Sequence, residues 1–118
     1  MTEIDGSVRI AILAREDCPN RGMAISVVER VVDETGVPAD IEIVEVVDDD
    51  DAHEHRVLGS PTVLVDGRDV DPDPMHAGFS SEDRLYRTPR GPSGWPQAEW
   101  IRDALLRAVA QTTSNGNH

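Results

Sequence analysis

The apolar and polar positions in the first part of the chain predict a strand, a helix and a second strand. Residues 8–14 read VRIAILA, a β-branched and mostly apolar run, which is typical of a strand buried in a parallel or mixed sheet. Met23 and the valines up to residue 32 recur at helical spacing, which predicts an amphipathic helix that begins near Pro19 and ends at Gly36. Residues 41–47 alternate at first and then become apolar, which predicts the second strand.

The second part of the chain predicts shorter elements and one long helix. One helical turn is expected over residues 51–56, and a short strand over 61–65 leads into a two-residue hairpin turn at Asp66 and Gly67. The strand returns at 68–70, residues 71–81 form a loop, and residues 84–88 are extended. Pro96 opens a last helix. Its apolar stripe contains Trp100, Ile101, Ala104, Leu105, Ala108 and Val109.

This order of elements predicts an α/β fold, with a central mixed sheet and helices packed on its faces. A length of 118 residues corresponds to one domain. We expect a flexible N-terminus over residues 1–7, a domain over 8–111 and a disordered tail over 112–118.

Composition narrows the range of partners and locations. Asp and Glu total 23 against 11 for Lys and Arg, giving a formal net charge of −12. Such a chain repels nucleic-acid phosphates and anionic lipid surfaces, so we expect neither nucleic acid nor membrane as a partner. The single cysteine cannot form a disulfide within the chain. No segment has the pattern of a signal peptide or of a membrane span of roughly 20 apolar residues, so we expect a cytoplasmic location.

Two short motifs stand at the ends of predicted strands. Cys18 follows the first strand within the sequence DCPNR, and Pro61 opens the third strand within GSPTVLV. This arrangement resembles the thioredoxin fold, in which an active-site cysteine begins the first helix and a cis-proline opens a later strand. The resemblance implies a thioredoxin-like sheet flanked by helices. It also implies a cis bond between Ser60 and Pro61, beside which backbone polar groups are exposed to an extended substrate.

A narrower resemblance is carried by four segments: residues 59–62, 65–70, 84–87 and 96–101. They look like a group of small bacterial thioredoxin-like proteins, some of which are labelled alkylmercury lyases. In that group a second cysteine follows the first by three positions, and another often precedes the Arg-Leu-Tyr motif. Arg21 and Asp83 occupy these positions here. The chain is therefore a monothiol form, and dithiol exchange within it is not expected.

The candidate site lies around Cys18. A thiol reacts as the thiolate, and a helix N-terminus favours that form, so we expect Cys18 to be solvent-reachable and activated, with Arg21 as the nearby cation. Asp83 would face the thiol if the loop before it folds over the site. The candidate catalytic residues are Cys18, Arg21 and Asp83. The candidate substrate-binding residues are Pro19, Asn20, Ser60, Pro61, Thr62 and Tyr86, and Arg84 and Arg87 are further candidates for a polar pocket.

Other conspicuous residues are interpreted as structural. Four aspartates at 48–51 stand beside His53 and His55, and carboxylates and imidazoles do ligate divalent ions. The spacing fits no calcium loop, and histidines two positions apart do not share a helix face. We therefore expect a solvated charge run, no metal and no cofactor. Trp100 is expected in the core, and Trp95 either packs or lines a cleft.

Three functional hypotheses remain open. The first is a small thioredoxin-like protein with thiol-dependent or degenerate redox activity, carried by Cys18 and a small thiol partner. The second is a non-redox scaffold, or a specialised biosynthetic protein, that binds or transforms a small molecule between Cys18 and Pro61. The third is an alkylmercury-lyase-like enzyme, a reaction that in that family resembles a task for two cysteines and an aspartate.

Overall fold

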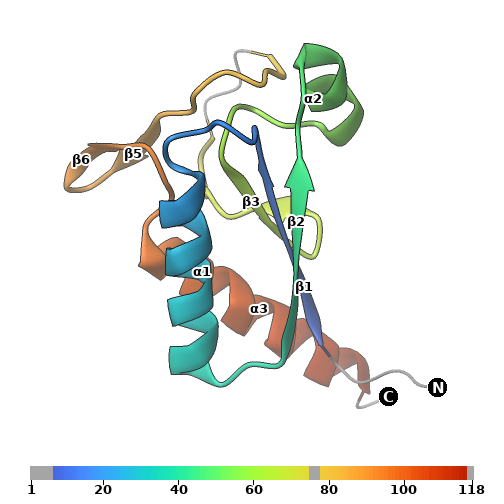
Figure 1. Cartoon of the computed structure of the whole chain (residues 1–118). Helices are drawn as coiled ribbons and strands as arrows, with labels where there is room; N and C mark the ends of the chain where they lie inside the picture. Colours follow the sequence, from blue (N-terminus) through green and yellow to red (C-terminus); the bar gives the residue numbers. More distant parts are fainter. Residues whose placement is uncertain (1–6, 75–77, 117–118) are drawn as a thin grey trace.

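The computed structural model describes residues 7–74 and 78–116, with side chains described up to residue 110. The expectations for residues 1–6 and 117–118 lie outside this part of the chain. Within the described residues, nine elements follow one another (Figure 1): β1 (Val8–Ala14), α1 (Arg21–Thr35), β2 (Ala39–Glu45), α2 (Asp49–His55), β3 (Thr62–Val65), β4 (Arg68–Asp69), β5 (Tyr86–Thr88), β6 (Gly91–Ser93) and α3 (Ala98–Gly116).

Four strands form a mixed sheet in the order β2-β1-β3-β4. Strand β1 is parallel to β2 and antiparallel to β3, with Ile12 opposite Ile43 on one side and Val63 on the other. Strands β3 and β4 are antiparallel. The predicted α/β fold with a central mixed sheet is confirmed, and the continuous apolar run of β1 is explained by its central place in the sheet.

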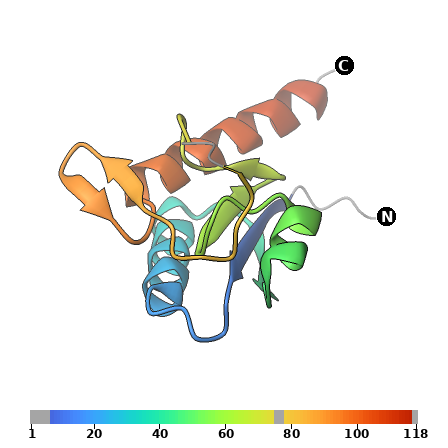
Figure 2. The same cartoon turned by 90° about the horizontal axis from the view of Figure 1, so that it is seen from above.

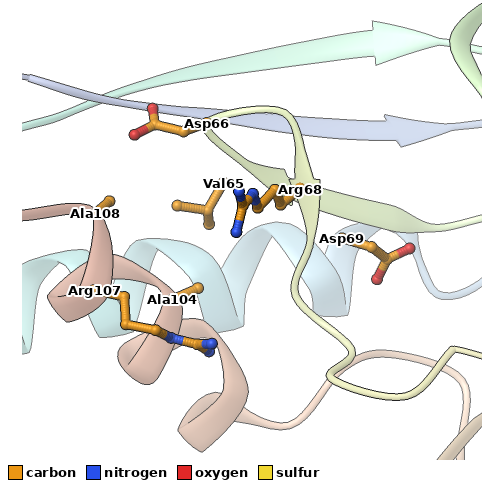
Figure 3. Close-up of a pocket in the computed structure, with 7 residues that line it drawn as sticks. All are labelled: Val65, Asp66, Arg68, Asp69, Ala104, Arg107 and Ala108. Atoms are coloured by element: carbon orange, nitrogen blue, oxygen red, sulfur yellow. The ribbon is translucent and has the colours of Figure 1, made fainter. Parts of the chain in front are cut away.

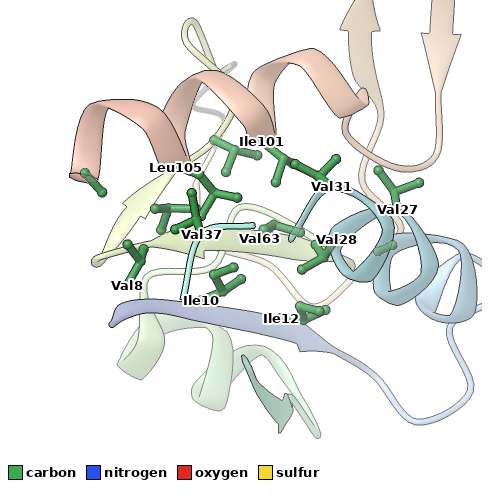
Figure 4. Packing of buried hydrophobic residues seen from close by; sticks show 14 residues of the cluster. Val8, Ile10, Ile12, Val27, Val28, Val31, Val37, Val63, Ile101 and Leu105 are labelled. Atoms are coloured by element: carbon green, nitrogen blue, oxygen red, sulfur yellow. The ribbon is translucent and has the colours of Figure 1, made fainter. Parts of the chain in front are cut away.

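Two helices cover one face of the sheet and a shorter helix covers part of the other. The main core joins β1 and β3 to α1 and α3 (Figure 4), with Val28, Ile101 and Leu105 fully buried. In Figure 2, α2 lies on the opposite side of β1 from α1 and α3. A smaller cluster lies under α2 and contains Leu13, Val46, Ala52 and Val57.

The turns that the sequence predicts are present. Asp66 and Gly67 have φ values of 50° and 83°, as expected for the two-residue turn that suits the twist of a hairpin. Gly36 ends α1 with a φ of 69°, and its N–H donates to the carbonyl oxygen of Val32. The predicted end of the first helix is therefore confirmed, and its first helical residue is Arg21.

Several boundaries differ from those predicted. Strand β2 covers Ala39–Glu45, two residues earlier than expected, because Val46 packs under α2 and Asp48 caps that helix by accepting from the N–H of Asp51. The last helix begins at Ala98 and continues to Gly116, so residues 112–116 of the expected tail are helical. No helix in the described part of the chain has the length and apolarity needed to cross a membrane.

The hairpin of β5 and β6 is not predicted by the sequence. Tyr86–Thr88 pairs with Gly91–Ser93 in a separate two-stranded sheet. The Thr88 hydroxyl donates to the carbonyl oxygen of Gly91 at 2.6 Å and accepts from the N–H of Arg90 at 3.2 Å. These bonds close a tight turn in a segment whose proline and glycine content otherwise suggests an irregular loop.

Candidate functional site

Cys18 lies in a tight turn between β1 and α1. Its N–H donates to the carbonyl oxygen of Arg15, and its own carbonyl oxygen accepts from the N–H of Arg21, both at 3.2 Å. The thiol is free, and only 7 % of the residue is exposed. The expectation of a solvent-reachable thiol is therefore corrected: Cys18 stands before the helix as predicted, but the folded chain buries it.

The loop that opens β3 carries a cis peptide bond between Ser60 and Pro61, as the resemblance implied. Ser60, Pro61 and Thr62 are all buried. The Ser60 hydroxyl accepts a hydrogen bond of 3.0 Å from the N–H of Arg15, the residue that follows β1. The turn before α1 and the proline loop, 45 positions apart in the chain, are thus tied together.

A short segment of the chain crosses this loop, and we call residues 81–84 the covering segment. The N–H of Ser60 donates to the carbonyl oxygen of Glu82 at 2.7 Å, and the N–H of Arg84 donates to the carbonyl oxygen of Ser60 at 2.9 Å. Ser60 and Asp83 form a parallel bridge. Both backbone polar groups of Ser60, which the resemblance assigns to an extended substrate, are therefore bonded to the protein's own chain.

Arg15 joins the covering segment to the turn that contains Cys18. Its guanidinium donates to the carboxylate of Asp83 at 2.8 Å, to the carbonyl oxygen of Ser81 at 2.7 Å and to Asp17 at 3.0 Å. The hydrogen bonds that Arg15 donates to Asp83 and then to Asp17 raise the pKa of its guanidinium, so it remains a cation. Asp83 does lie against this turn, and its carboxylate is bound by Arg15.

Ser81, the first residue of the covering segment, is also attached to α2. Both the N–H and the hydroxyl of Ser81 donate to the carboxylate of Asp49, at 3.0 and 2.9 Å. These bonds lower the pKa of Asp49, the backbone N–H having the largest effect. One member of the acidic run therefore has a structural task that the sequence did not indicate.

A buried ionic network lies behind the proline loop. The guanidinium of Arg84, 6 % exposed as a side chain, bonds both carboxylate oxygens of Asp69 at 2.7 and 3.2 Å. It also reaches the Thr62 hydroxyl at 3.1 Å and a carboxylate oxygen of Asp71 at 3.7 Å. Sequence reasoning missed both aspartates, since they occupy a hairpin and a loop that otherwise suggest solvent-exposed residues.

Tyr86 belongs to the same network. Its ring is fully buried, and the Arg84 guanidinium lies 4.3 Å from the ring centroid. The hydroxyl donates to the carbonyl oxygen of Pro61 at 2.5 Å. Tyr86 therefore supports the proline loop from within, whereas the sequence suggested a substrate-binding residue.

Tyr86 is expected to stay protonated until the protein unfolds in alkali. Burial is the largest cause that raises its pKa. The unfolded chain releases this proton near pH 10, so folding stability is complete below that pH and falls as pH rises above it. Tyr86 is the only tyrosine in the chain, so ultraviolet absorbance of tyrosinate measures it directly.

In that titration, absorbance and circular dichroism should change together. Tyr86→Phe should abolish the absorbance step and reduce the alkaline loss of stability. A tyrosinate signal that appears near pH 10 while the circular dichroism stays native would contradict the buried position.

The remaining predicted residues lie around the start of α1. Pro19 is exposed, and Arg21 is half-buried at the first position of the helix. Asn20 forms the N-cap without a side-chain cap bond, and its side chain fills the space beside Gly94 that a Cβ there would occupy. The end of the β5–β6 hairpin is thus packed against the beginning of α1.

The histidines of the acidic segment face their own helix. His53 Nδ1 lies 2.8 Å from the carbonyl oxygen of Asp49, and His55 Nδ1 lies 3.0 Å from that of Asp51. Within residues 7–74 and 78–116, no group of three or more His, Cys, Asp or Glu side chains is placed to hold a metal ion.

Surface cavities accompany these clusters. Arg84 and Arg87 line a cavity of about 170 Å³ with Asp71 and Asp83, and Tyr86 is not among its lining residues. A second groove of about 250 Å³ separates the β3–β4 turn from α3 (Figure 3). Its two carboxylates already have partners, since Asp66 accepts from the N–H of Arg9 and Asp69 binds Arg84.

Comparison with known proteins adds no relative to this description. No protein-family model matches the chain, and no curated protein matches it.

Proposed function

We propose that the chain is a thioredoxin-like domain. The proposal is supported by the strand order β2-β1-β3-β4, with only β1 and β2 parallel. It is also supported by the position of Cys18 in the turn between β1 and α1, two residues before the N-cap Asn20, and by the cis bond at Pro61. Packing of α1 and α3 on one face, opposite the short α2, agrees with this arrangement.

Within that fold, we propose a non-redox binding domain in place of a thiol oxidoreductase. The observation that carries this proposal is the hydrogen bonding of Ser60. Its N–H and carbonyl oxygen are both occupied by the covering segment, which is held by Arg15 on one side and by Asp49 on the other. An extended protein substrate has no free backbone partner at this position, and the lone buried Cys18 has no resolving thiol.

A second candidate keeps chemistry at Cys18. The thiol lies in the turn before α1, and 7 % of the residue remains exposed. The Cys18 thiolate would attack the S–S bond of a small disulfide such as oxidised glutathione, form a mixed disulfide and release one glutathione thiolate. Carbon–mercury cleavage is disfavoured, because the sequence holds one cysteine.

Alkylation of Cys18 by iodoacetamide is expected to be about tenfold or more slower in the native protein than in denaturant, because access requires local opening. Cys18→Ser provides the blank.

In an insulin assay with dithiothreitol for recycling, we expect no turnover above background, because attack by one thiol stops at the mixed disulfide. Arg21→Cys supplies the missing thiol, and we expect turnover to stay near background because the covering segment still occupies Ser60.

The same measurements separate the two candidates. Rapid native alkylation, together with a glutathione adduct on Cys18 by intact-mass spectrometry, would favour the monothiol function. Insulin turnover by Arg21→Cys close to that of a two-cysteine thioredoxin would show that the covering segment does not block an extended substrate, and would overturn the binding-domain proposal.

A further inference from the structure

A cleft of about 440 Å³ lies between α1, the β5–β6 hairpin and the start of α3. Figures 1 and 2 both show the hairpin beside these two helices. Val27, Trp95 and Ala98 supply apolar lining. Arg30 on α1 and Arg90 in the hairpin turn supply two positive charges, and Glu99 on α3 supplies one negative charge. Cys18 and Pro61 do not line it, so what it binds does not depend on the function proposed above.

The walls of this cleft are held in place before any ligand arrives. Ser93 Oγ donates to the carbonyl oxygen of Trp95 at 2.8 Å and accepts from its N–H at 3.2 Å. Thr88 holds the turn that carries Arg90, and Asn20 packs against Gly94. Binding therefore does not have to meet the entropic cost of ordering these loops.

Arg30 and Arg90, like several other arginines among the described residues, form no ion pair and keep their positive charge uncompensated. Arg15, Arg84 and Arg102 each form an ion pair with an aspartate or glutamate. Neither Arg30 nor Arg90 has a carboxylate within ion-pair distance among the described residues. In a chain with a net charge of −12, two guanidinium groups against the single carboxylate of Glu99 give this cleft a net positive lining.

We infer that this cleft binds a small anion that carries a flat apolar ring. Guanidinium groups form paired hydrogen bonds with carboxylate, phosphate or sulfonate oxygens. Trp95 lines the cleft and is partly buried against the core, and an indole is a group on which a flat ring can stack. The volume is within the range of small-molecule sites.

The test uses the full chain and the fluorescent aromatic sulfonate anilinonaphthalene sulfonate (ANS). Trp95 and Trp100 are the two tryptophans of the chain, so Trp100→Phe leaves Trp95 as the only indole. In this variant ANS should quench Trp95 emission in a saturable manner. Arg30→Gln with Arg90→Gln should weaken ANS binding by about tenfold or more, since hydrogen bonds to charged groups are lost.

The matched control replaces two exposed arginines at the other groove, Arg68→Gln with Arg107→Gln, and should change ANS affinity less than about twofold. Trp95→Phe should retain binding, and Trp95→Leu should lose most of it. Neutral N-phenylnaphthylamine should bind wild type and the Arg30/Arg90 variant equally. Near-ultraviolet circular dichroism verifies that each variant is folded.

Three results would overturn the inference. The first is the absence of saturable quenching in Trp100→Phe. The second is equal ANS affinity in wild type and the folded Arg30/Arg90 variant. The third is an equal loss of affinity in the Arg68/Arg107 control, which would show that general charge, and not this cleft, attracts the probe.

Discussion

Arg84→Ala is expected to lower the free energy of unfolding by about 3–5 kcal/mol, as found when one partner of a buried ion pair is removed. Asp69 and Asp71, whose side chains are 16 % and 10 % exposed, would be left without their cation. The Thr62 hydroxyl would also lose its contact with the guanidinium, and the Tyr86 ring its cation. Urea unfolding followed by circular dichroism measures the difference.

Arg87→Ala is the matched control, because Arg87 is exposed on β5. It should change stability by less than about 0.5 kcal/mol. If the unpaired carboxylates cause the loss, Asp69→Asn in the Arg84→Ala background should recover part of it. A loss for Arg84→Ala no larger than that for Arg87→Ala would contradict the buried network.

Gly59→Ala is expected to destabilise the protein by about 2 kcal/mol or more, through strain and overpacking at one position. Gly59 has a φ of 144°, a conformation that side chains rarely adopt, and a Cβ there would lie 2.7 Å from Cβ and 3.1 Å from Cα of Arg84. The close approach places the covering segment against the proline loop, so the segment would have to shift.

Urea unfolding measures the effect of Gly59→Ala on the free energy of unfolding, and Gly22→Ala is expected to behave differently in the same measurement. Gly22 lies in α1, and a Cβ there would meet nothing within 4 Å. Alanine should be neutral or stabilise by up to about 1 kcal/mol, because it loses less backbone freedom on folding. Equal effects of the two substitutions would show that the contact between Gly59 and Arg84 is absent in solution.

Much of the fold was predictable because its signals are local. The apolar run before residue 15 predicts a central strand, and strand β1 covers Val8–Ala14 as expected. Glycine at position 36 ends α1, and the Asp66–Gly67 pair makes a hairpin turn, since both positions require positive φ. The interpretation of Cys18 as the residue before the first helix rests on the same kind of pattern.

The sequence by itself thus determined the order of the elements apart from the β5–β6 hairpin, the mixed sheet and the placing of one cysteine at a strand-to-helix turn. Only the tertiary structure decided that Cys18 is buried, that Ser60 bonds to Glu82 and Arg84, and that Arg15 binds Asp83. These partners are 22 to 68 positions apart in the chain. Pairing over such distances depends on how the chain closes its loops around a common core, which no local periodicity encodes.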